Sequence, residues 1–336
     1  MSNTASIRLL VADELPYSHG VENVSVALVK EFLALFEEVT WVTARPARSR
    51  ELKQLFPNAN NLSFTSLFEE ESTAPSNKRS STSPGWKGVV KRLPLIGRGA
   101  RKAYRRRIDD RLGRICQDNR CTHCFVNYAL SQTAPKLGIP VVGLVHDLNF
   151  LHYPENFAPG APRELRRSIQ NWLQSADAVT VLSEAGKEEI LALAEKTPRA
   201  RVEIIPNAIK TLGQEEVAQQ RADEPPTFLY PATALAHKNH WGLLQAVRKL
   251  ALEEIPFQVI MTGSRIDEIG GNEPLANATV EKARQFYIEH RKVLAKTVSF
   301  RAARDLDELT RLYHKAHRVI LPTQYEGFGL PLLEAM

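Results

Sequence analysis

Two glutamates near the end of the chain, Glu326 and Glu334, are separated by seven residues. Glycines flank Phe328 between them, and Pro331 follows at a position typical of the first turn of a helix. Glycine lets the backbone approach a ligand closely, and a helix start offers N–H groups to an anion. Carboxylates do not bind phosphate, but they do bind hydroxyl groups. The pattern therefore favours a sugar-nucleotide pocket, with an ordinary strand–loop–helix and a capping acid as the alternative.

Other polar side chains follow short apolar runs that we predict to be parallel strands. Ligands bind beyond the carboxyl ends of the strands in open parallel sheets, so these positions are candidates for a binding region. Lys238 stands between such a strand end and a helix start, where its ammonium can meet a phosphate. An ordinary surface lysine is the alternative. The other candidates at strand ends are Asp13, Asn127, His146, Asp147, Ser183, Asn207, residues 233–237, Gly263, Ser264 and residues 325–329.

Three cysteines, Cys116, Cys121 and Cys124, have the spacing of the first three ligands of an iron–sulfur loop. The sequence holds no fourth cysteine, and it lacks the second pair that a zinc ribbon needs. Cys124 also begins an apolar run typical of a strand. We therefore predict small buried side chains at these positions and no metal.

Short β-branched runs alternate with helical patterns, which is typical of βαβ units and a parallel sheet. A helix with apolar residues from Val24 to Leu35 at spacings of three and four is predicted between the first two strands. Further helices are predicted over 100–116, over 240–252 with Leu250 among its inward residues, and over 305–316. The predicted strands are 7–12, 39–43, 124–127, 140–146, 178–183, 202–206, 227–232, 257–263, 298–302 and 318–323.

The elements suggest an α/β fold of two Rossmann-like domains in tandem. Residues 1–210 form the first, with a basic insertion over 69–116. The polar stretch 211–226 ends in two prolines and suits a linker. Residues 227–336 form the second domain. Two such sheets with their strand ends facing each other would enclose a cleft.

The net charge of +6 is concentrated in one segment. Residues 78–114 hold 13 lysines and arginines and two acidic residues, so the rest of the chain is acidic overall. On an exposed helix this segment could hold the protein on an anionic membrane surface, with a solvated charged helix as the alternative. No apolar run reaches the ~18–20 residues that span a bilayer, and the N-terminus lacks a secretory pattern. We expect a cytoplasmic protein.

Two function classes are disfavoured by the residues. A dinucleotide oxidoreductase needs Gly-x-Gly-x-x-Gly after its first strand, where this chain reads ADELPYSHGVEN. A nucleic-acid-binding protein is suggested by the basic segment, but only Trp86 and Tyr104 within it could stack on bases. We therefore predict no nucleic-acid partner.

The motif EGFGLPLLE at 326–334 resembles the signature of retaining glycosyltransferases of the GT-B fold, in particular glycosyltransferase family 4. The resemblance runs from about residue 7 to 336 and spares 44–120. Because the chain stops two residues after Glu334, the resemblance implies an incomplete second domain. Other segments resemble the family's motifs in the same order: HGVENVSVAL (19–28), HDLNFLHYPENF (146–157), VTVLSEAGKEEI (179–190), IIPNAI (204–209) and YPATALAHKNHWGLLQAV (230–247).

The resemblance implies roles for individual residues. His146 would touch the donor sugar near the reaction centre, with a satisfied core histidine as the alternative. Glu326 would face the transferred sugar or its phosphate, and Glu334 would bind the ribose. The family usually has an arginine shortly before the lysine that matches Lys238, so His237 would supplement Lys238 at the pyrophosphate. The remaining donor-binding candidates are Gly20 in the first loop, the backbone of Phe328, Gly329 and Leu330, and the further positions Asn207, Ser183 and Asp147.

The resemblance also implies a reaction. A hexose, from GDP-mannose or another nucleotide-sugar donor, would be moved with retention to a glycan or lipid-linked acceptor in the synthesis of a surface polysaccharide such as lipopolysaccharide. No side chain is an obvious nucleophile, and no Asp-x-Asp metal motif follows a strand, so no metal or other cofactor is expected. The protein would be cytoplasmic or peripheral at the inner face of the membrane. A non-catalytic nucleotide-sugar-binding or scaffold protein stays open as the alternative.

Overall fold

A computed structural model describes residues 6–13, 19–44, 46–68, 98–131, 133–207, 225–302 and 306–336. The contacts divide the chain into two compact units. Unit 1 comprises Met1–His146, Arg167–Val181 and Ile190–Ile204, and unit 2 comprises Asp147–Arg166, Leu182–Glu189 and Ile205–Met336. Most of the predicted insertion and linker lies outside the described residues, and the domain boundaries drawn from the sequence stay a prediction.

Unit 1 is built on a seven-stranded sheet in which every neighbouring pair is parallel. The strand order is β3-β2-β1-β4-β5-β6-β7, which is the order of a doubly wound Rossmann-like sheet with an added strand. The strands are β1 (Arg8–Asp13), β2 (Glu38–Thr43), β3 (Leu62–Ser66), β4 (His123–Val126), β5 (Val141–Val145), β6 (Ala178–Val181) and β7 (Arg201–Ile204).

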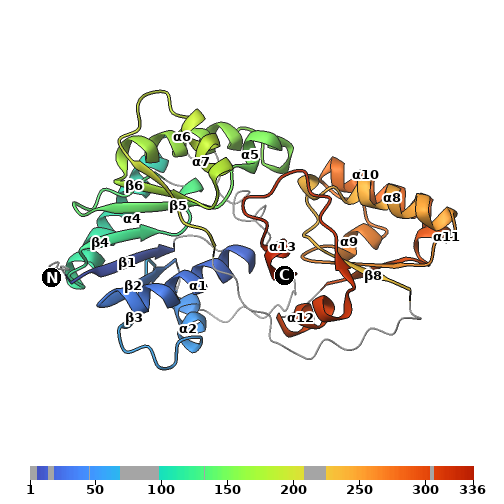
Figure 1. Ribbon diagram of the computed structural model, residues 1–336. Coiled ribbons are helices and arrows are strands. Elements are labelled where there is room, and N and C mark those ends of the chain that lie inside the picture. Colours follow the sequence, from blue (N-terminus) through green and yellow to red (C-terminus); the bar gives the residue numbers. More distant parts are fainter. Residues whose placement is uncertain are drawn as a thin grey trace, which may run out of the picture. The chain divides into compact units, whose positions relative to one another are not determined.

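Helices connect the strands of unit 1, as a parallel sheet requires (Figure 1). Two of them, α6 and α7, contain the points where the chain passes between the units. The helices are α1 (His19–Leu35), α2 (Pro46–Gln54), α4 (Arg98–Asp118), α6 (Ala161–Ser175) and α7 (Glu184–Ala192), with the 3₁₀ turn η1 (Ala129–Ser131). The short helix α5 (Asn149–His152) and the 3₁₀ turn η2 (Pro154–Asn156) follow β5 in the chain and belong to unit 2.

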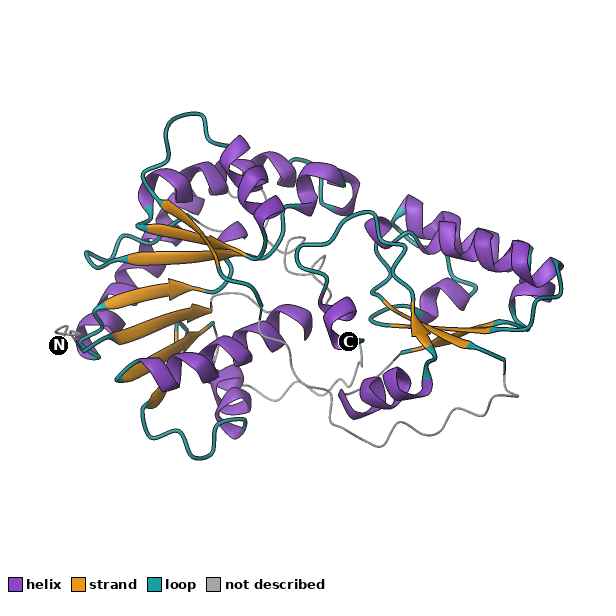
Figure 2. Cartoon of the chain, in the orientation of Figure 1, coloured by secondary structure: helices purple, strands orange, loops and turns teal. Residues whose placement is uncertain are grey.

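Unit 2 contains a four-stranded parallel sheet of order β10-β9-β8-β11. Its strands are β8 (Thr227–Pro231), β9 (Gln258–Thr262), β10 (Val298–Arg301) and β11 (Arg318–Val319). Figure 2 shows these strands between helices on either side. The helices are η3 (Ala236–Lys238), α8 (His240–Leu252), α9 (Asp267–Gly270), α10 (Ala278–Glu289), α11 (Arg291–Leu294), α12 (Leu306–Lys315) and α13 (Leu330–Glu334).

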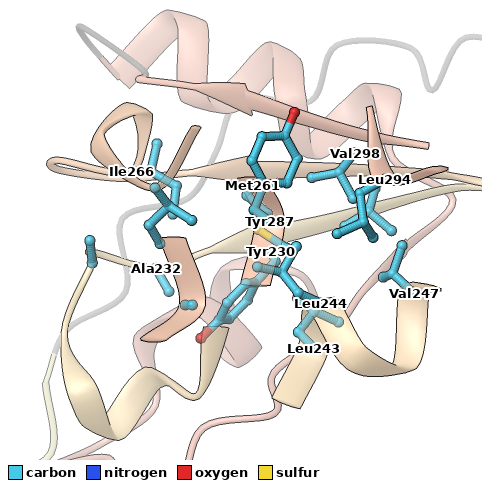
Figure 3. Packing of buried hydrophobic residues seen from close by; sticks show 14 of the residues in the cluster. Tyr230, Ala232, Leu243, Leu244, Val247, Met261, Ile266, Tyr287, Leu294 and Val298 are labelled. Atoms are coloured by element: carbon cyan, nitrogen blue, oxygen red, sulfur yellow. The ribbon is translucent and has the colours of Figure 1, made fainter. Parts of the chain in front are cut away.

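The core of unit 2 follows from the alternation of side chains along its strands. Tyr230 and Met261 point to the face covered by α8 and α10, in the cluster drawn in Figure 3. Their neighbours Leu229 and Ile260 point to the other face, where Leu312 of α12 covers them. Burying a side chain of this size stabilises the fold by roughly 1.5–3 kcal/mol. The two layers therefore hold β8 rigidly in the middle of the sheet.

The structure confirms every predicted strand to within two residues, except at two places. The edge strand β3, LSFTS, was missed because its half-exposed side chains do not form an apolar run. The last predicted strand, 318–323, ends at Val319. One further ladder bond joins the Ile320 N–H to the Leu229 carbonyl at 2.9 Å. Pro322 then offers no N–H to the sheet, and the chain turns away.

Two predictions about the ends of helices need correction, and one about the cysteines is confirmed. Leu35 ends its helix with 72% of its surface exposed, and Leu250, predicted to face inward, is 38% exposed. Both stand in the last turn of a helix. The three cysteines are all buried free thiols, as predicted.

Candidate active site

Lys238 is placed by the turn that joins β8 to α8. The hydroxyl of Tyr230, at the end of β8, donates a hydrogen bond to the Lys238 carbonyl. Asn239 adopts the left-handed conformation with φ +55°, which asparagine tolerates well. Its side-chain oxygen accepts from the Gly242 N–H at 3.2 Å and so caps α8. Its side-chain N–H₂ donates to the Pro322 carbonyl at 3.1 Å. The short sequence from Tyr230 to Gly242 therefore fixes the backbone that carries Lys238.

The side chains of Lys238 and Glu326 form an ion pair at the carboxyl ends of two neighbouring strands, β8 and β11. The Lys238 Nζ lies 2.6 Å from Glu326 Oε1, and the two side chains are 16% and 26% exposed. The backbone supports the pair, since the Gln324 N–H donates to the His237 carbonyl at 2.8 Å. The fold thus brings the predicted phosphate-binding lysine onto the first glutamate of the paired-glutamate motif. Together they present a cation for an anionic group and a carboxylate for hydroxyl groups.

Two histidines flank Lys238, and both are buried. Burial lowers the pKa of His237 to about 4, with the Lys238 charge as a second cause. Burial likewise lowers the pKa of His240 to about 4. The ring of His240 packs on that of Tyr230, with centroids 5.1 Å apart. Both imidazoles are therefore neutral at pH 7, so any support that His237 gives Lys238 comes through hydrogen bonding and packing.

Asp147 belongs to the same unit and shares the electrostatic environment of the pair. Burial raises its pKa above the usual value, while the Asn149 N–H and the Lys238 charge oppose that shift. The Asn149 N–H donates to Asp147 Oδ1 at 3.1 Å. The carboxylate charges of Glu326 and Glu189 raise the pKa of Asp147 further. This predicted candidate is thus brought close to Lys238 and Glu326.

The loop that follows Glu326 leads into the short helix α13. The hydroxyl of Ser183 donates to the Gly327 carbonyl at 3.4 Å and also caps α7 by accepting from the Gly186 N–H at 3.2 Å. Gly329 has φ +82°, a conformation that favours glycine, and it precedes the first residue of α13, Leu330. Phosphate binding by the backbone of Phe328–Leu330 stays a prediction.

Glu334 is oriented by a tyrosine of helix α12. The hydroxyl of Tyr313 donates to Glu334 Oε2 at 2.7 Å. Burial and the neighbouring Glu334 carboxylate raise the pKa of Tyr313, so its hydroxyl stays protonated. Tyr313 belongs to the apolar cluster on the α12 face of the sheet. The second glutamate of the motif is therefore attached to the core of unit 2 by one strong hydrogen bond.

His146 follows β5 at the carboxyl edge of the sheet of unit 1. It is 8% exposed, and burial lowers its pKa to about 4. Its Nε2 lies 2.8 Å from the Asn127 carbonyl, which is an acceptor, so the neutral ring donates from Nε2 and keeps Nδ1 as an acceptor. The side chain of Asn127 in turn donates to the Ser25 hydroxyl on α1. A shared role of His146 with Glu326 stays a prediction.

The remaining predicted residues are placed without contacts that assign them a role. Gly20 lies in the first turn of α1 in unit 1. Asn207 is a buried residue of unit 2, and within the described part of the chain its Oδ1 has no hydrogen-bond partner. Their binding roles stay predictions.

Sequence reasoning missed a group of residues that contact the Lys238–Glu326 region. Two of them, Tyr153 and Asn156, lie in the segment 146–157, in which only His146 and Asp147 were candidates. Tyr325 was a candidate only as one of the strand-end residues 325–329, because a tyrosine beside a motif has no spacing of its own that predicts its contacts. The missed contacts come from Tyr153, which donates to Gln324 Oε1 at 3.2 Å, from Asn156, 3.4 Å from His237 Nδ1, and from Glu189, which accepts from the Tyr325 hydroxyl. Asn277 supports Asn156 by donating to its side-chain oxygen at 3.0 Å.

The described residues contain neither a cluster of metal ligands nor a membrane-spanning helix. Within the described ranges, no three His, Cys, Asp or Glu side chains cluster as metal ligands would. The same part of the chain contains no helix that combines the length and the apolar character needed to cross a bilayer. The basic segment 78–114 is described only from residue 98, in α4, where Arg105 pairs with Asp109 at 2.7 Å. Metal independence and membrane binding both stay predictions.

Two family models match the chain. One, described as Glycosyltransferase Family 4, covers residues 18–211, and the other, described as Glycosyl transferases group 1, covers residues 214–336. Among curated proteins, the O-antigen chain mannosyltransferase B of Escherichia coli is 27% identical in an alignment of 209 residues that covers 57% of this chain and 49% of that protein. The chain therefore spans about half the length of this relative.

Solved structures resemble the whole chain in fold. A sucrose-phosphate synthase from Thermosynechococcus elongatus matches with a TM-score of 0.60 at 17% identity, over 98% of this chain and 78% of the other. A glycosyltransferase from Rickettsia africae matches with a TM-score of 0.62 at 12% identity, over 98% and 77%. At such identities the likeness establishes the fold, which is the GT-B arrangement of two Rossmann-like units. Because a single family model spans more than half of the residues, the chain belongs to glycosyltransferase family 4.

Proposed function

We propose that this chain transfers a hexose from a nucleotide-sugar donor to a glycan or lipid-linked acceptor, with retention, in the synthesis of a surface polysaccharide. The observation that carries the proposal is the 2.6 Å contact between Lys238 and Glu326 at the strand ends of unit 2. It joins a cation suited to a diphosphate to a carboxylate suited to sugar hydroxyls. The similarity to an O-antigen mannosyltransferase supports a polysaccharide product and a mannosyl donor.

The proposed reaction is a front-face displacement at the anomeric carbon. The acceptor oxygen forms the new bond to this carbon while the bond to the diphosphate oxygen breaks. The leaving phosphate takes the proton of the acceptor hydroxyl. Lys238 stabilises the negative charge that develops on the diphosphate, and Glu326 binds a hydroxyl of the transferred sugar. We assign no metal to these steps, so EDTA should leave the rate unchanged.

The preferred donor is tested by binding to the 336-residue chain. A ligand that binds only the folded state raises the unfolding temperature, so GDP-mannose, UDP-glucose and dTDP-glucose are compared in a thermal-shift titration. We expect GDP-mannose to give the largest shift in the wild-type protein and a much smaller one in the Lys238→Ala variant. Equal unfolding temperatures with and without all three donors would contradict the proposed function.

Binding alone would also suit a non-catalytic scaffold protein. Product analysis separates the two readings, because an enzyme releases GDP from GDP-mannose in the presence of an acceptor and a scaffold does not. Lipid extracts of bacterial envelopes supply mixed acceptors for this assay. Stoichiometric binding without GDP release would favour the scaffold.

The lipid-linked acceptor gives the basic helix α4 a proposed role. Its arginines could hold the chain on anionic lipid, where such an acceptor is embedded. Co-sedimentation with phosphatidylglycerol vesicles should exceed that with phosphatidylcholine vesicles at low salt. Equal sedimentation would remove the membrane part of the proposal.

A further inference from the structure

The residue before Glu326 is held by two hydrogen bonds to its hydroxyl group. The Leu148 N–H donates to the Tyr325 oxygen at 3.0 Å. The Tyr325 hydroxyl donates to Glu189 Oε2, also at 3.0 Å. Burial raises the pKa of Tyr325, so the hydroxyl remains a donor throughout the working pH range. Tyr325 is thereby tethered to two segments of unit 2 that lie far from it in the sequence.

Glu189 has a second partner that fixes its carboxylate. Its Oε1 lies 2.5 Å from His152 Nε2, and the His152 ring packs on Tyr325 with centroids 4.9 Å apart. The Glu189 side chain is 26% exposed, so burial alone does not set its position. The three side chains therefore support one another, with each carboxylate oxygen of Glu189 directed to a different group.

The two hydrogen bonds of the Tyr325 hydroxyl also restrain the next residue in the chain, Glu326. Glu326 follows Tyr325 directly and contacts Lys238 through its carboxylate. In the proposed reaction the Lys238 ammonium binds the diphosphate, so it can no longer be the main restraint on Glu326. The Leu148 N–H, the Tyr325 hydroxyl and Glu189 have no assigned contact with the donor, so we expect their hydrogen bonds to persist when it binds.

We propose that Tyr325 and Glu189 form a positioning pair that holds the Glu326 carboxylate in place for the sugar of the donor. This inference rests on the proposed function and deepens it. Tyr325 and Glu189 are positioning residues, because neither touches the reacting atoms. Their contribution is specific to the sugar, since Glu326 is assigned to the sugar hydroxyls and not to the nucleotide.

The experiment compares the affinities for GDP-mannose and for GDP by calorimetry in four single variants and one double variant. Tyr325→Phe removes the hydroxyl and keeps the ring. Glu189→Leu removes the acceptor, whereas Glu189→Gln keeps an acceptor oxygen. Tyr153→Phe is the matched control, because it removes a hydroxyl that bonds to Gln324, the residue on the other side of Tyr325.

We expect Tyr325→Phe and Glu189→Leu to weaken GDP-mannose binding by about tenfold while GDP binding changes by less than about twofold. Glu189→Gln should restore most of the affinity, and Tyr153→Phe should behave as the wild type. The double variant Tyr325→Phe/Glu189→Leu should lose no more than the weaker-binding single variant, because both changes remove one interaction. A loss confined to the sugar cannot arise from general unfolding, which would weaken GDP equally.

Three outcomes overturn the inference, and they differ from one another. If the wild type binds GDP-mannose and Tyr325→Phe binds it equally well, the positioning pair is wrong and the proposed function stands. If the wild type binds none of the three sugar nucleotides of the thermal-shift titration, the proposed function fails and the inference fails with it. A parallel loss of GDP and GDP-mannose affinity would show a purely structural role and would also overturn it.

Discussion

Lys238 combines local and distant constraints within a few residues. Its backbone is held by Tyr230 and by the cap of α8, both close in sequence. Its side chain meets Glu326, which is 88 positions away. A charge-assisted contact of this kind, only partly exposed, is stronger than an ordinary surface ion pair. The ammonium group is therefore positioned before any ligand binds. A charge that is preorganised in this way can stabilise a transition state without the cost of reorganisation.

The role of Lys238 is tested by removing its charge. Lys238→Met should lower kcat/KM for GDP-mannose by about hundredfold or more, as the loss of a preorganised charge-stabilising group usually does. Lys249→Met is the matched control, because Lys249 is exposed in the last turn of the neighbouring helix α8. Steady-state kinetics of GDP release measure both. Equal kcat/KM values for the two variants would contradict the assignment.

At the scale of elements, the loops after β8, β9 and β11 meet at one edge of the unit 2 sheet because the strands are parallel. The loop after β9 passes against the loop after β8, with the Ala234 N–H donating to the Ser264 carbonyl at 3.1 Å. Gly263 makes this passage possible. Its φ is +137°, and an added Cβ would lie 2.5 Å from the Ala232 carbonyl oxygen.

Gly263→Ala should therefore destabilise unit 2 by about 2 kcal/mol or more, because both the backbone angle and the space exclude a side chain. Gly113→Ala is the control, and it should change the free energy of unfolding in the opposite direction. Gly113 lies inside α4 with nothing within 4 Å of its added Cβ, so alanine should stabilise that helix by about 1 kcal/mol. Urea unfolding followed by circular dichroism measures both changes. A neutral Gly263→Ala variant would mean that the loop relaxes freely.

At the scale of the whole molecule, both units bury neutral histidines at their strand ends. His146 belongs to unit 1, and His237 and His240 belong to unit 2. Burial lowers the pKa of each to about 4. The unfolded chain exposes them with a pKa near the usual value of about 6.5. Between these two values the unfolded state binds more protons than the folded state, so acid favours unfolding.

The stability of the chain should consequently fall as the pH drops from 6.5 towards 4, by up to about 1.4 kcal/mol per pH unit for each buried histidine. Well above pH 6.5, where the unfolded state has also lost these protons, the residues should contribute no slope. His240→Phe replaces one ring with another that cannot bind a proton. It should reduce the slope of the free energy of unfolding against pH by up to about 1.4 kcal/mol per pH unit, which is the contribution of one proton. The free energy of unfolding in urea at several pH values measures the slope. The same slope in both proteins would exclude His240 as a source.

The sequence by itself determined the strand positions, the parallel topology and the identity of most strand-end residues. These follow from local pattern, since buried parallel strands are short apolar runs and their ends are where polar residues resume. The edge strand β3 was not predicted, because its exposed side chains interrupt the apolar run by which a buried strand is identified. Residue types and spacing also singled out Lys238, Glu326 and Glu334 as candidates, the family resemblance implied their roles, and all three lie in unit 2 with defined partners.

Only the tertiary structure decided which side chains meet and in which state of protonation. Tyr325 contacts Glu189 across 136 positions and Leu148 across 177, and no local pattern encodes such pairs. Neutral His146, His237 and His240 likewise could not be inferred, because the pKa of a histidine depends on how much water the fold removes from it. Sequence periodicity fixes what each strand presents at its end, whereas packing between distant segments fixes what each of those residues can do.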